Sequence, residues 1–437
     1  MRAHRQQQND RKGNTQQPKQ YSATHKLYSS ILFQRAPPLF PDSGETLLAF
    51  EITIHSRVDS IGVRPFLRRP HLPFRIELAM AATVMFVASC ASGPPAAAPP
   101  TNNPVEVRAV IERSVPRTAS DRAGWAADMY AAFTMLGIDP TRENACAVSA
   151  VIEQESGFRV DPVIPGLPAI AWREIDSRAA RAGVPHLIVH AALQLKSPSG
   201  RSYSDRIDGA RTEKDLSDIY EDFIGAVPLG PTLFAERNPI RTRGPMQVNI
   251  AFAEQYAAAR HYPYPVKSSI ADEVFTRRGS LYFGTAHLLA YPAPYDAYLY
   301  RFADFNAGQY ASRNAAFQRA VSGASGIPVA PDGALVPHGG DANSPGSTEL
   351  ALRALGKRLN MGDGAIHNAL EQSRSAEFEQ TQLYRGVFAL AERAEGHPLP
   401  RESIPRIQLH GPKIARSLTT EWYARRVDQR FKRCLDQ

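Results

Sequence analysis

The chain has 437 residues, of which 43% are apolar, enough to bury the core of one large domain or two ordinary ones. Its formal net charge is +8, but residues 1–89 hold 12 Lys and Arg against 6 Asp and Glu, and the rest holds 39 against 37. Because the part after residue 89 is nearly neutral and has no basic stripe interleaved with aromatic residues, we do not expect nucleic-acid binding.

Residues 1–62 form a polar, Gln-rich leader without hydrophobic periodicity, a composition typical of disorder. A signal peptide stands at the N-terminus of a precursor, yet this leader precedes the signal-like segment described next. We therefore expect translation to begin downstream, near Val63. Efficient export of a precursor that begins at Met1 would contradict this expectation.

Residues 63–89 are typical of a lipoprotein signal peptide. Three arginines form a basic flank, and residues 78–89 are a run of apolar and small residues too short to span a bilayer but suited to a signal-peptide core. The ending VAS before Cys90 resembles a bacterial lipobox, in which the cysteine becomes the lipidated first residue of the mature protein. The alternative is a buried hydrophobic helix with an incidental cysteine.

Residues 90–118 begin with a Pro/Ala-rich stretch that we expect to act as a tether. In a polyproline-like conformation it would hold a folded body roughly 40 Å from its anchor. Ala91 follows the cysteine in place of the Asp associated with inner-membrane retention. We therefore expect a cell-envelope protein anchored to the membrane through lipidated Cys90, on the periplasmic face of the outer membrane.

Helical patterns dominate from residue 119 onward. Trp125, Met129 and Phe133 recur at the spacing of one helix face, with Ser120 as the expected cap. The dipeptide Asp139-Pro140 predicts the start of a second helix. Almost no alternating strand pattern and no internal repeat follow, so the sequence predicts a mainly α fold.

Beyond the second helix, helical stretches alternate with segments that proline and glycine interrupt. A mixed segment comes first, followed by a helical set, a Gly/Pro-rich loop and a C-terminal helical extension that we expect to pack on the core. In this order the segments are 159–243, with helical candidates around 172–183, 185–195 and 213–225, then 249–321, 322–347 and 348–437.

The stretch VIEQESGF ends the second helix with two glutamates. At 100° per residue the apolar residues of this helix form one stripe, and Glu155 falls in its middle, whereas Glu153 lies on the far side with Ser149 as an ordinary solvated residue. A carboxyl on an apolar face has its pKa raised by desolvation, as a general acid near neutral pH requires. The alternative is that the helix ends at Gly157 and Glu155 leaves the core at the last turn.

Three segments carry a resemblance to lysozyme-like lytic transglycosylases and follow that family's order. ESGF (155–158) looks like its Glu-Ser-x-Phe signature, GPMQVN (244–249) is similar to the Gly-x-Met-Gln segment of its sugar cleft, and FADFNAGQY (302–310) is similar to its Ala-Tyr-Asn-Ala-Gly segment. More specifically, the chain resembles a family of uncharacterised bacterial lipoproteins with this core. The resemblance implies a lysozyme-like domain over 119–321, with residues 159–243 as an insertion.

The resemblance implies that Glu155 is the single catalytic acid/base on the N-acetylmuramic acid–N-acetylglucosamine linkage of peptidoglycan, although glycosidases commonly use two carboxylates. Protonated Glu155 would donate to the leaving oxygen while the N-acetyl oxygen of the substrate stabilises the developing cation. The ionised carboxylate would then take a proton from the muramic C6 hydroxyl, which closes onto C1 as a 1,6-anhydro end. This chemistry requires no metal or organic cofactor.

The other motif residues would bind the substrate, glycan strands of peptidoglycan. Ser156 would orient Glu155, or be a plain hydroxyl at the helix end. Gly244 would let backbone approach the sugar, or merely make a turn. Met246 would be a wall of the site, or a core residue. Gln247 would bond N-acetyl and hydroxyl groups.

Asn306 would bind the acetamido group, or form an Asn-Ala-Gly turn. Phe305 departs from the family because a Tyr is usual there, so a phenolic hydroxyl must come from elsewhere. The nearby candidates are Tyr298, Tyr300 and Tyr310, unless they are packing aromatics. The insertion 159–243 also departs from the family and could serve as a lid, a substrate-shaping lobe or a surface for cell-envelope protein partners.

A second carboxylate and two histidines bear on whether the site is hydrolytic or binds a metal. Asp161 could act as a second carboxylate, which would make the protein a hydrolysing lysozyme, although its Asp-Pro setting fits a turn more simply. His261 and His287 lack a metal-binding companion at useful spacing, so we propose no metal site.

Cys146 and Cys434 remain as an even pair once Cys90 is acylated, in an oxidising compartment. Cys146 points away from the stripe that holds Glu155. A disulfide between the two would therefore attach the C-terminal helix across the back of the domain, and two buried thiols are the alternative.

Three functions stay open at this point. The first is a membrane-anchored lytic transglycosylase. The second is a non-catalytic peptidoglycan-binding or scaffold lipoprotein that recruits partners through residues 159–243 and the helices after residue 349. The third is a hydrolysing muramidase.

Overall fold

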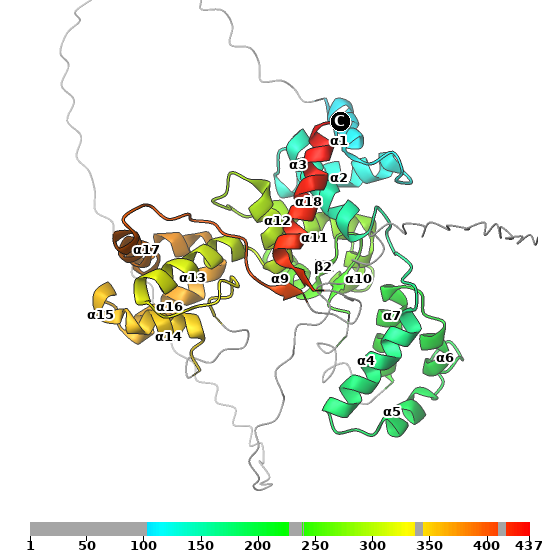
Figure 1. Cartoon of the computed structure of the whole chain (residues 1–437). Helices are drawn as coiled ribbons and strands as arrows, with labels where there is room; N and C mark the ends of the chain where they lie inside the picture. The colour runs from blue at the N-terminus through cyan, green and yellow to red at the C-terminus, as the bar shows by residue number, and fades with distance from the viewer. Residues whose placement is uncertain (1–102, 227–237, 239, 337–343, 410–416) are drawn as a thin grey trace, which may run out of the picture. The chain divides into compact units, whose positions relative to one another are not determined.

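The computed structural model is mainly α-helical, which confirms the fold class predicted from the sequence. Figure 1 shows its helices with their labels. The leader, the signal peptide and Cys90 lie outside the described residues, as does the start of the tether. None of the helices in the described part is both long and apolar enough to cross a membrane. The structure describes residues 103–226, 238, 240–336, 344–409 and 417–437.

The folded body begins earlier than the tether prediction allows. Helix α1 (Pro104–Ser114) lies inside the predicted tether, is capped by the Asn103 side chain and buries Ile111 in the first hydrophobic core. Helix α2 (Arg122–Leu136) follows with the face that the periodicity predicts, but its cap is Asp121 instead of Ser120. Asp121 adopts the left-handed conformation that short polar side chains tolerate best.

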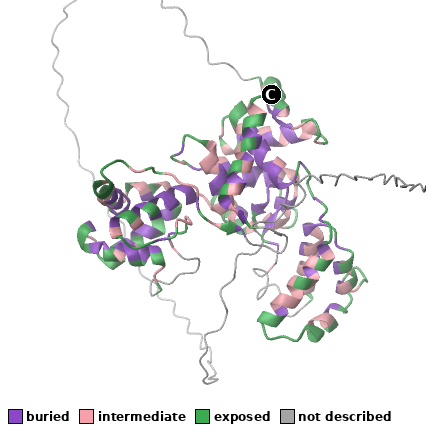
Figure 2. Cartoon of the chain, in the orientation of Figure 1, coloured by how far each residue is buried: buried purple, intermediate pink, exposed green. Residues whose placement is uncertain are grey.

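Helix α3 (Arg142–Glu155) runs through the first core and is buried on nearly every side. It packs against α1, α11 (Arg277–Leu289) and α18 (Thr420–Leu435). The expected solvated side is therefore wrong for Ser149, which is buried with its Oγ 3.1 Å from Ser114 Oγ. Figure 2 shows this burial as purple along α3 and α11.

The last helix of the chain completes the first core. Helix α18 packs against α3 and α12 (Tyr298–Ala307), and a disulfide joins Cys434 near its end to Cys146 near the start of α3, with Cα atoms 5.6 Å apart. Because Cys434 meets the start of α3, α18 runs antiparallel to α3. The C-terminal helix therefore begins near the Glu155 end of α3 and runs along α3 to the disulfide, and it does not lie across the back of the domain.

The predicted insertion folds into helices with a small core of their own. The helical candidates match α4, α5 and α7, whereas α6 has no counterpart in the prediction. Helix α5 buries little, with Leu187 and Ile188 exposed, as the green ribbon in Figure 2 shows. These helices are α4 (Leu167–Arg181), α5 (His186–Leu193), α6 (Tyr203–Asp208) and α7 (Glu213–Gly225).

The chain then makes a short hairpin before the helices that precede α11. Strands β1 (Thr242–Arg243) and β2 (Val248–Asn249) pair antiparallel on either side of the GPMQ segment. Helices α9 (Ile250–Ala259) and α10 (Ile270–Phe275) follow, and α10 packs against both β1 and α11.

The helices after α12 build a second hydrophobic core with α13, which corrects the expectation of one extension packed on the first core. Helix α18 enters the first core instead, together with Leu409 of β3 (Gln408–Leu409) and Leu418 of β4 (Leu418–Thr419), two strands that pair antiparallel. The elements of the second core are α13 (Ala311–Ser325), α14 (Ser347–Ala354), α15 (Gly356–Leu359), α16 (Asp363–Glu371), the 3₁₀ turns η3 (Gln372–Arg374) and η4 (Ala376–Gln380), and α17 (Gln382–Glu395).

Candidate active site

Glu155 is the last residue of α3, and the structure buries it, as the apolar stripe predicts, with 5% of its surface exposed. The helix ends in two left-handed residues, Gly157 and Phe158, whose φ angles are 57° and 61°. This turn brings the Phe158 ring edge-on to Trp125, with centroids 5.2 Å apart, so the chain folds back onto the core. Glu155 therefore does not leave the core at the last turn.

Burial raises the pKa of Glu155 from 4.5 to about 8. The Tyr423 hydroxyl opposes this rise by stabilising the ionised carboxylate, the charge of Glu213 adds to it, and the Arg430 guanidinium lowers the pKa again. Because burial dominates, the carboxyl holds its proton at neutral pH. Glu155 therefore has the protonation state that a general acid requires.

A tyrosine that the sequence did not single out, Tyr423, lies near Glu155. Its hydroxyl faces Glu155 from α18, although it makes no regular hydrogen bond within the described residues. The predicted candidates serve other contacts: Tyr298 donates to Asn144 Oδ1 at 2.7 Å, and the buried Tyr310 ring lies under a guanidinium. Tyr300 is half-buried, and its ring lies 5.7 Å from another tyrosine ring.

Arg430 connects the two glutamates of α3. It is almost fully buried, and its Nε lies 3.6 Å from Glu153 Oε1. Arg433 approaches the same Glu153 oxygen at 3.3 Å. Glu153 is therefore half-buried and paired with α18, which corrects its prediction as an ordinary solvated residue.

Ser156 behaves as the plain hydroxyl that the sequence analysis left as an alternative. Its side chain is buried and donates to the carbonyl of Ile152 at 3.1 Å, one turn back along α3. The structure therefore gives this hydroxyl a helix-end role.

The GPMQ turn is shaped by packing. Gly244 has φ 72°, and a Cβ built there would lie 2.0 Å from the carbonyl oxygen of Val274, so only glycine fits between the turn and α10. Met246 is fully buried, and its sulfur would lie 2.5 Å from a Cβ built on Gly284 of α11. Both residues therefore follow the alternative of a turn and a core methionine.

Gln247 is held at both ends of its amide. Its Nε2 donates to Glu213 Oε2 at 3.1 Å, and its Oε1 accepts from Thr242 Oγ1 at 2.9 Å. The side chain is buried, with backbone φ 50°. Gln247 is thus bonded to Glu213, the first residue of α7, which the sequence analysis missed because no motif marks it.

Asn306 reaches the same helix as Tyr423. Its Oδ1 accepts from Thr420 Oγ1 at 2.8 Å, and its buried Nδ2 has no hydrogen-bond partner among the described residues. Thr420 and Tyr423 stand three residues apart on α18 and so share one helix face. The first turn of α18 therefore connects the Asn306 amide with the Glu155 carboxyl.

Asp161 lies near the start of α7. Burial raises its pKa, and the Thr212 hydroxyl lowers it by hydrogen bonding. Beside it opens a pocket of about 330 Å³ that the rings of Trp125 and Phe158 also line. Arg277 on its wall is already paired with Asp121 at 2.6 Å, and Arg159 also lines the pocket.

The histidines give no sign of a metal site. Burial lowers the pKa of His287 to about 4, and its ring lies between Phe252 and Phe305, at 4.6 and 5.2 Å. His261 is exposed. Across the described residues, no three His, Cys, Asp or Glu side chains gather closely enough to hold a metal ion.

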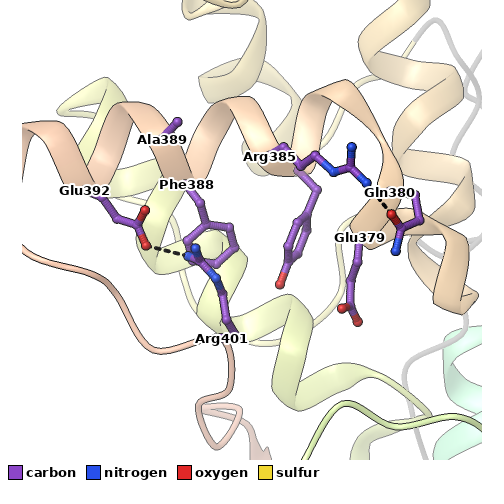
Figure 3. A pocket seen from close by; sticks show the side chains of 8 residues that line it. Glu379, Gln380, Arg385, Phe388, Ala389, Glu392 and Arg401 are labelled. Atoms are coloured by element: carbon purple, nitrogen blue, oxygen red, sulfur yellow. Dashed lines mark hydrogen bonds and ion pairs between the residues drawn. The ribbon is translucent and has the colours of Figure 1, made fainter.

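A second pocket, of about 360 Å³, opens along α17 and is shown in Figure 3. The Arg401 guanidinium lies 3.8 Å from the centre of the Phe388 ring and pairs with Glu392 at 2.8 Å. Glu379 lies 3.6 Å from the buried Arg313. Because these charged groups are paired with one another, we assign no ligand to this pocket.

The comparisons with known proteins agree on one family. A family model described as "Protein of unknown function (DUF1615)" matches residues 118–437. The chain is 51% identical over 354 residues to "Uncharacterized protein YaiW" of Escherichia coli (strain K12), covering 81% of this chain and 96% of that protein. No solved structure matches the chain.

Proposed function

We propose that this chain, which belongs to the DUF1615 family, is a lytic transglycosylase that cleaves the N-acetylmuramic acid–N-acetylglucosamine linkage of peptidoglycan. The observation that carries the proposal is the buried carboxyl of Glu155, whose pKa of about 8 keeps it protonated at neutral pH. A buried, protonated carboxyl is suited to donate to a leaving oxygen. The substrate class comes from the resemblance of the three motif segments.

The reaction needs Glu155 in both protonation states. Protonated Glu155 donates to the glycosidic oxygen, and the N-acetyl oxygen of the substrate stabilises the cation that develops at C1. The resulting carboxylate accepts the proton of the muramic C6 hydroxyl as that oxygen bonds to C1. The Tyr423 hydroxyl and the Arg430 guanidinium stabilise the carboxylate during this interval, because both favour the ionised form.

Asn306 is the residue best suited to the acetamido group. Its buried Nδ2 lacks a partner among the described residues, and a buried donor without a partner costs about 1–3 kcal/mol. The carbonyl oxygen of an N-acetyl group would satisfy it. Gln247 is a poorer candidate for direct sugar contact because Glu213 and Thr242 already hold its amide.

We also propose that acylated Cys90 anchors the protein to the membrane, on the periplasmic face of the outer membrane. This part of the proposal rests on the sequence of residues 63–90. An anchored enzyme would reach glycan strands within the length of its tether. The insertion remains a candidate surface for cell-envelope partners, with Leu187 and Ile188 exposed on α5.

Digestion of purified murein tests the proposal. The mature protein and its Glu155→Gln variant are incubated with sacculi, and the released fragments are weighed by mass spectrometry. We expect 1,6-anhydro ends from the wild-type protein and a loss of at least about 100-fold in the variant. Glu143→Gln is the matched control, because Glu143 is exposed in the first turn of the same helix, far along α3 from Glu155.

A hydrolysing muramidase is the second candidate, and the charge of Glu213 close to Glu155 favours it. A second carboxylate could activate water, as in glycosidases that use two acidic residues. Reducing ends in the same digest would support this candidate and reject the first. Retained binding to sacculi without any release would reject both and leave a peptidoglycan-binding protein.

A further inference from the structure

We infer that the insertion makes a second membrane contact, in which the exposed face of α5 lies on the surface of an anionic lipid bilayer. We call this surface the α5 apolar face and define it by Leu187, Ile188 and Ala191 of the helix and by Leu195 directly after it. The inference rests on the proposed lipid anchor for nearness to a bilayer, and it is independent of the proposed catalysis.

One side of α5 is held by the small core of the insertion. Leu193 is buried in that core, and Val189 packs against it. The His190 ring stacks on the Trp172 ring of α4 with centroids 4.6 Å apart, and its Nε2 lies 2.8 Å from Asp176 Oδ1. These contacts fix the rotation of α5, so its remaining side faces away from the core of the insertion.

The opposite side of α5 is apolar and open to solvent (Figure 2). Leu187 and Ile188 are 72% and 60% exposed, and Leu195, two residues beyond the helix, is 63% exposed. Ala191 stands one turn after Leu187 and is exposed too. A surface helix normally turns polar residues to water, because exposed apolar side chains forgo the free energy of burial. Apolar residues on both sides of α5 therefore indicate that an apolar surface covers this face in the working protein.

The charge of the surrounding segment selects an anionic surface. Residues 177–204 contain four Lys and Arg and no Asp or Glu. Arg178 and Arg181 share a single carboxylate, that of Glu174, at 2.8 and 3.4 Å. Lys196 is exposed and forms no ion pair with the residues that the structure describes. An apolar helix face with basic residues beside it is typical of helices that bind in the interface of anionic membranes.

The proposed anchor brings such a surface within reach. Residues 91–102 separate Cys90 from Asn103, the cap of α1, and they span at most about 40 Å when extended. The folded body is therefore confined near the bilayer, and a confined surface binds at a high effective concentration. A lipid contact of modest affinity is then enough to hold the insertion at the membrane.

Vesicle co-sedimentation tests this contact without the anchor. The mature protein with Cys90→Ser, which carries no lipid, is mixed with vesicles of phosphatidylethanolamine and phosphatidylglycerol, or of phosphatidylcholine alone. We expect binding to the anionic vesicles only, and a loss of at least about tenfold in Leu187→Gln/Ile188→Gln. Lys196→Gln should lose about fivefold, and added salt should weaken the binding of the parent protein.

Met135→Gln/Leu350→Gln is the matched control. Both side chains are 55% exposed and stand on α2 and α14, outside the insertion. We expect this variant to bind the anionic vesicles as well as its parent does. Glutamine favours helices about as strongly as leucine and methionine do, so the variants should keep their folds, as circular dichroism would show.

Leu187→Trp in the Cys90→Ser protein provides a measurement that does not depend on a loss of binding. Lipids brominated on their acyl chains quench a tryptophan that enters the bilayer, and we expect them to quench the fluorescence that Trp adds to the parent signal. No binding of the parent protein to anionic vesicles, equal binding by Leu187→Gln/Ile188→Gln, or no quenching would overturn the inference.

Other occupants of the α5 apolar face would give distinct results. A dimer that forms without lipid and is lost in Leu187→Gln/Ile188→Gln, together with no vesicle binding, would overturn the inference in favour of a second copy of the chain. A monomer that binds no vesicles would overturn it in favour of a protein partner. Neither result depends on glycan release, and a mature wild-type protein whose mass shows no acyl chain on Cys90 would reject the anchor alone.

Discussion

Glu155 lies between two helices that come from opposite ends of the folded chain and act on it in opposite directions. Helix α18 brings Tyr423 and Arg430, which both favour the carboxylate, whereas α7 brings Glu213, whose charge favours the protonated acid. Helix α18 belongs to the first core and is joined to α3 by a disulfide, but α7 belongs to the small core of the insertion. The ESGF segment thus supplies the buried carboxyl, and segments distant in the chain act on its pKa.

Loss of the disulfide should have the largest effect on stability, because it removes the covalent link between α18 and α3. Replacement of Cys146 and Cys434 by Ser removes a cross-link between residues 288 apart in the chain. We expect the free energy of unfolding to fall by about 4 kcal/mol, measured by urea denaturation. The wild-type protein in reductant should behave like the double variant, and an unchanged urea midpoint would show that α18 is held without the cross-link.

The pH dependence of stability should reveal the raised pKa of Glu155. A carboxyl whose folded pKa of about 8 exceeds its unfolded value of 4.5 contributes stability that is complete below 4.5 and disappears as the pH rises to 8. Glu155→Gln removes this dependence, so its free energy of unfolding should gain on that of the wild-type protein by an amount on the order of 4 kcal/mol between pH 4.5 and 8. Two parallel stability curves would contradict the raised pKa.

Gly244→Ala should distinguish packing from sugar contact in the GPMQ turn. The added Cβ meets a backbone oxygen, and φ 72° is strained for alanine, so we expect a loss of about 2–3 kcal/mol in urea unfolding. Gly166→Ala is the control, because Gly166 has φ 71° but open space around its Cβ, and its loss should stay near 1 kcal/mol. Equal losses at the two positions would refute the packing role.

Tyr423→Phe should have the smallest effect on stability. Its informative result is the direction in which the pH profile of glycan release moves. Without the hydroxyl, the Glu155 carboxylate loses a stabilising donor, so the alkaline limb of glycan release moves to higher pH. The free energy of unfolding should change by less than about 1 kcal/mol. Tyr298→Phe, which removes a hydroxyl bonded to Asn144, should leave the pH profile in place. A shift to lower pH in Tyr423→Phe would reverse the assigned role of α18.

The sequence predicted what local periodicity determines. The mainly α class and the inward direction of Glu155 both follow from helical spacing of apolar residues. The periodicity of α3 also gave a wrong prediction: Ser149 and Glu153 were expected on a solvated side, but other helices contact both. A stripe shows which side must be buried, but it cannot show that a helix is buried on the other sides too.

Tyr423 and Glu213 could not be found in the same way, because they approach Glu155 from segments remote in sequence and carry no motif. The cysteine pair was the one available signal for α18. A disulfide does join the pair, but the pair alone could not show that α18 packs antiparallel along α3 and begins near Glu155. Gly244 and Met246 are the opposite case. They match the sugar-cleft motif, but the structure explains both residues by their packing against α10 and α11.

Titration of the Glu155 carboxyl in the folded wild-type protein tests the account most directly. Infrared difference spectra of the wild-type protein and Glu155→Gln isolate the carboxylic acid band of this one side chain. The account predicts that the band persists through pH 7 and disappears with a midpoint near 8. A midpoint near the ordinary value of 4.5 would mean that Glu155 is already ionised at neutral pH and cannot serve as the acid.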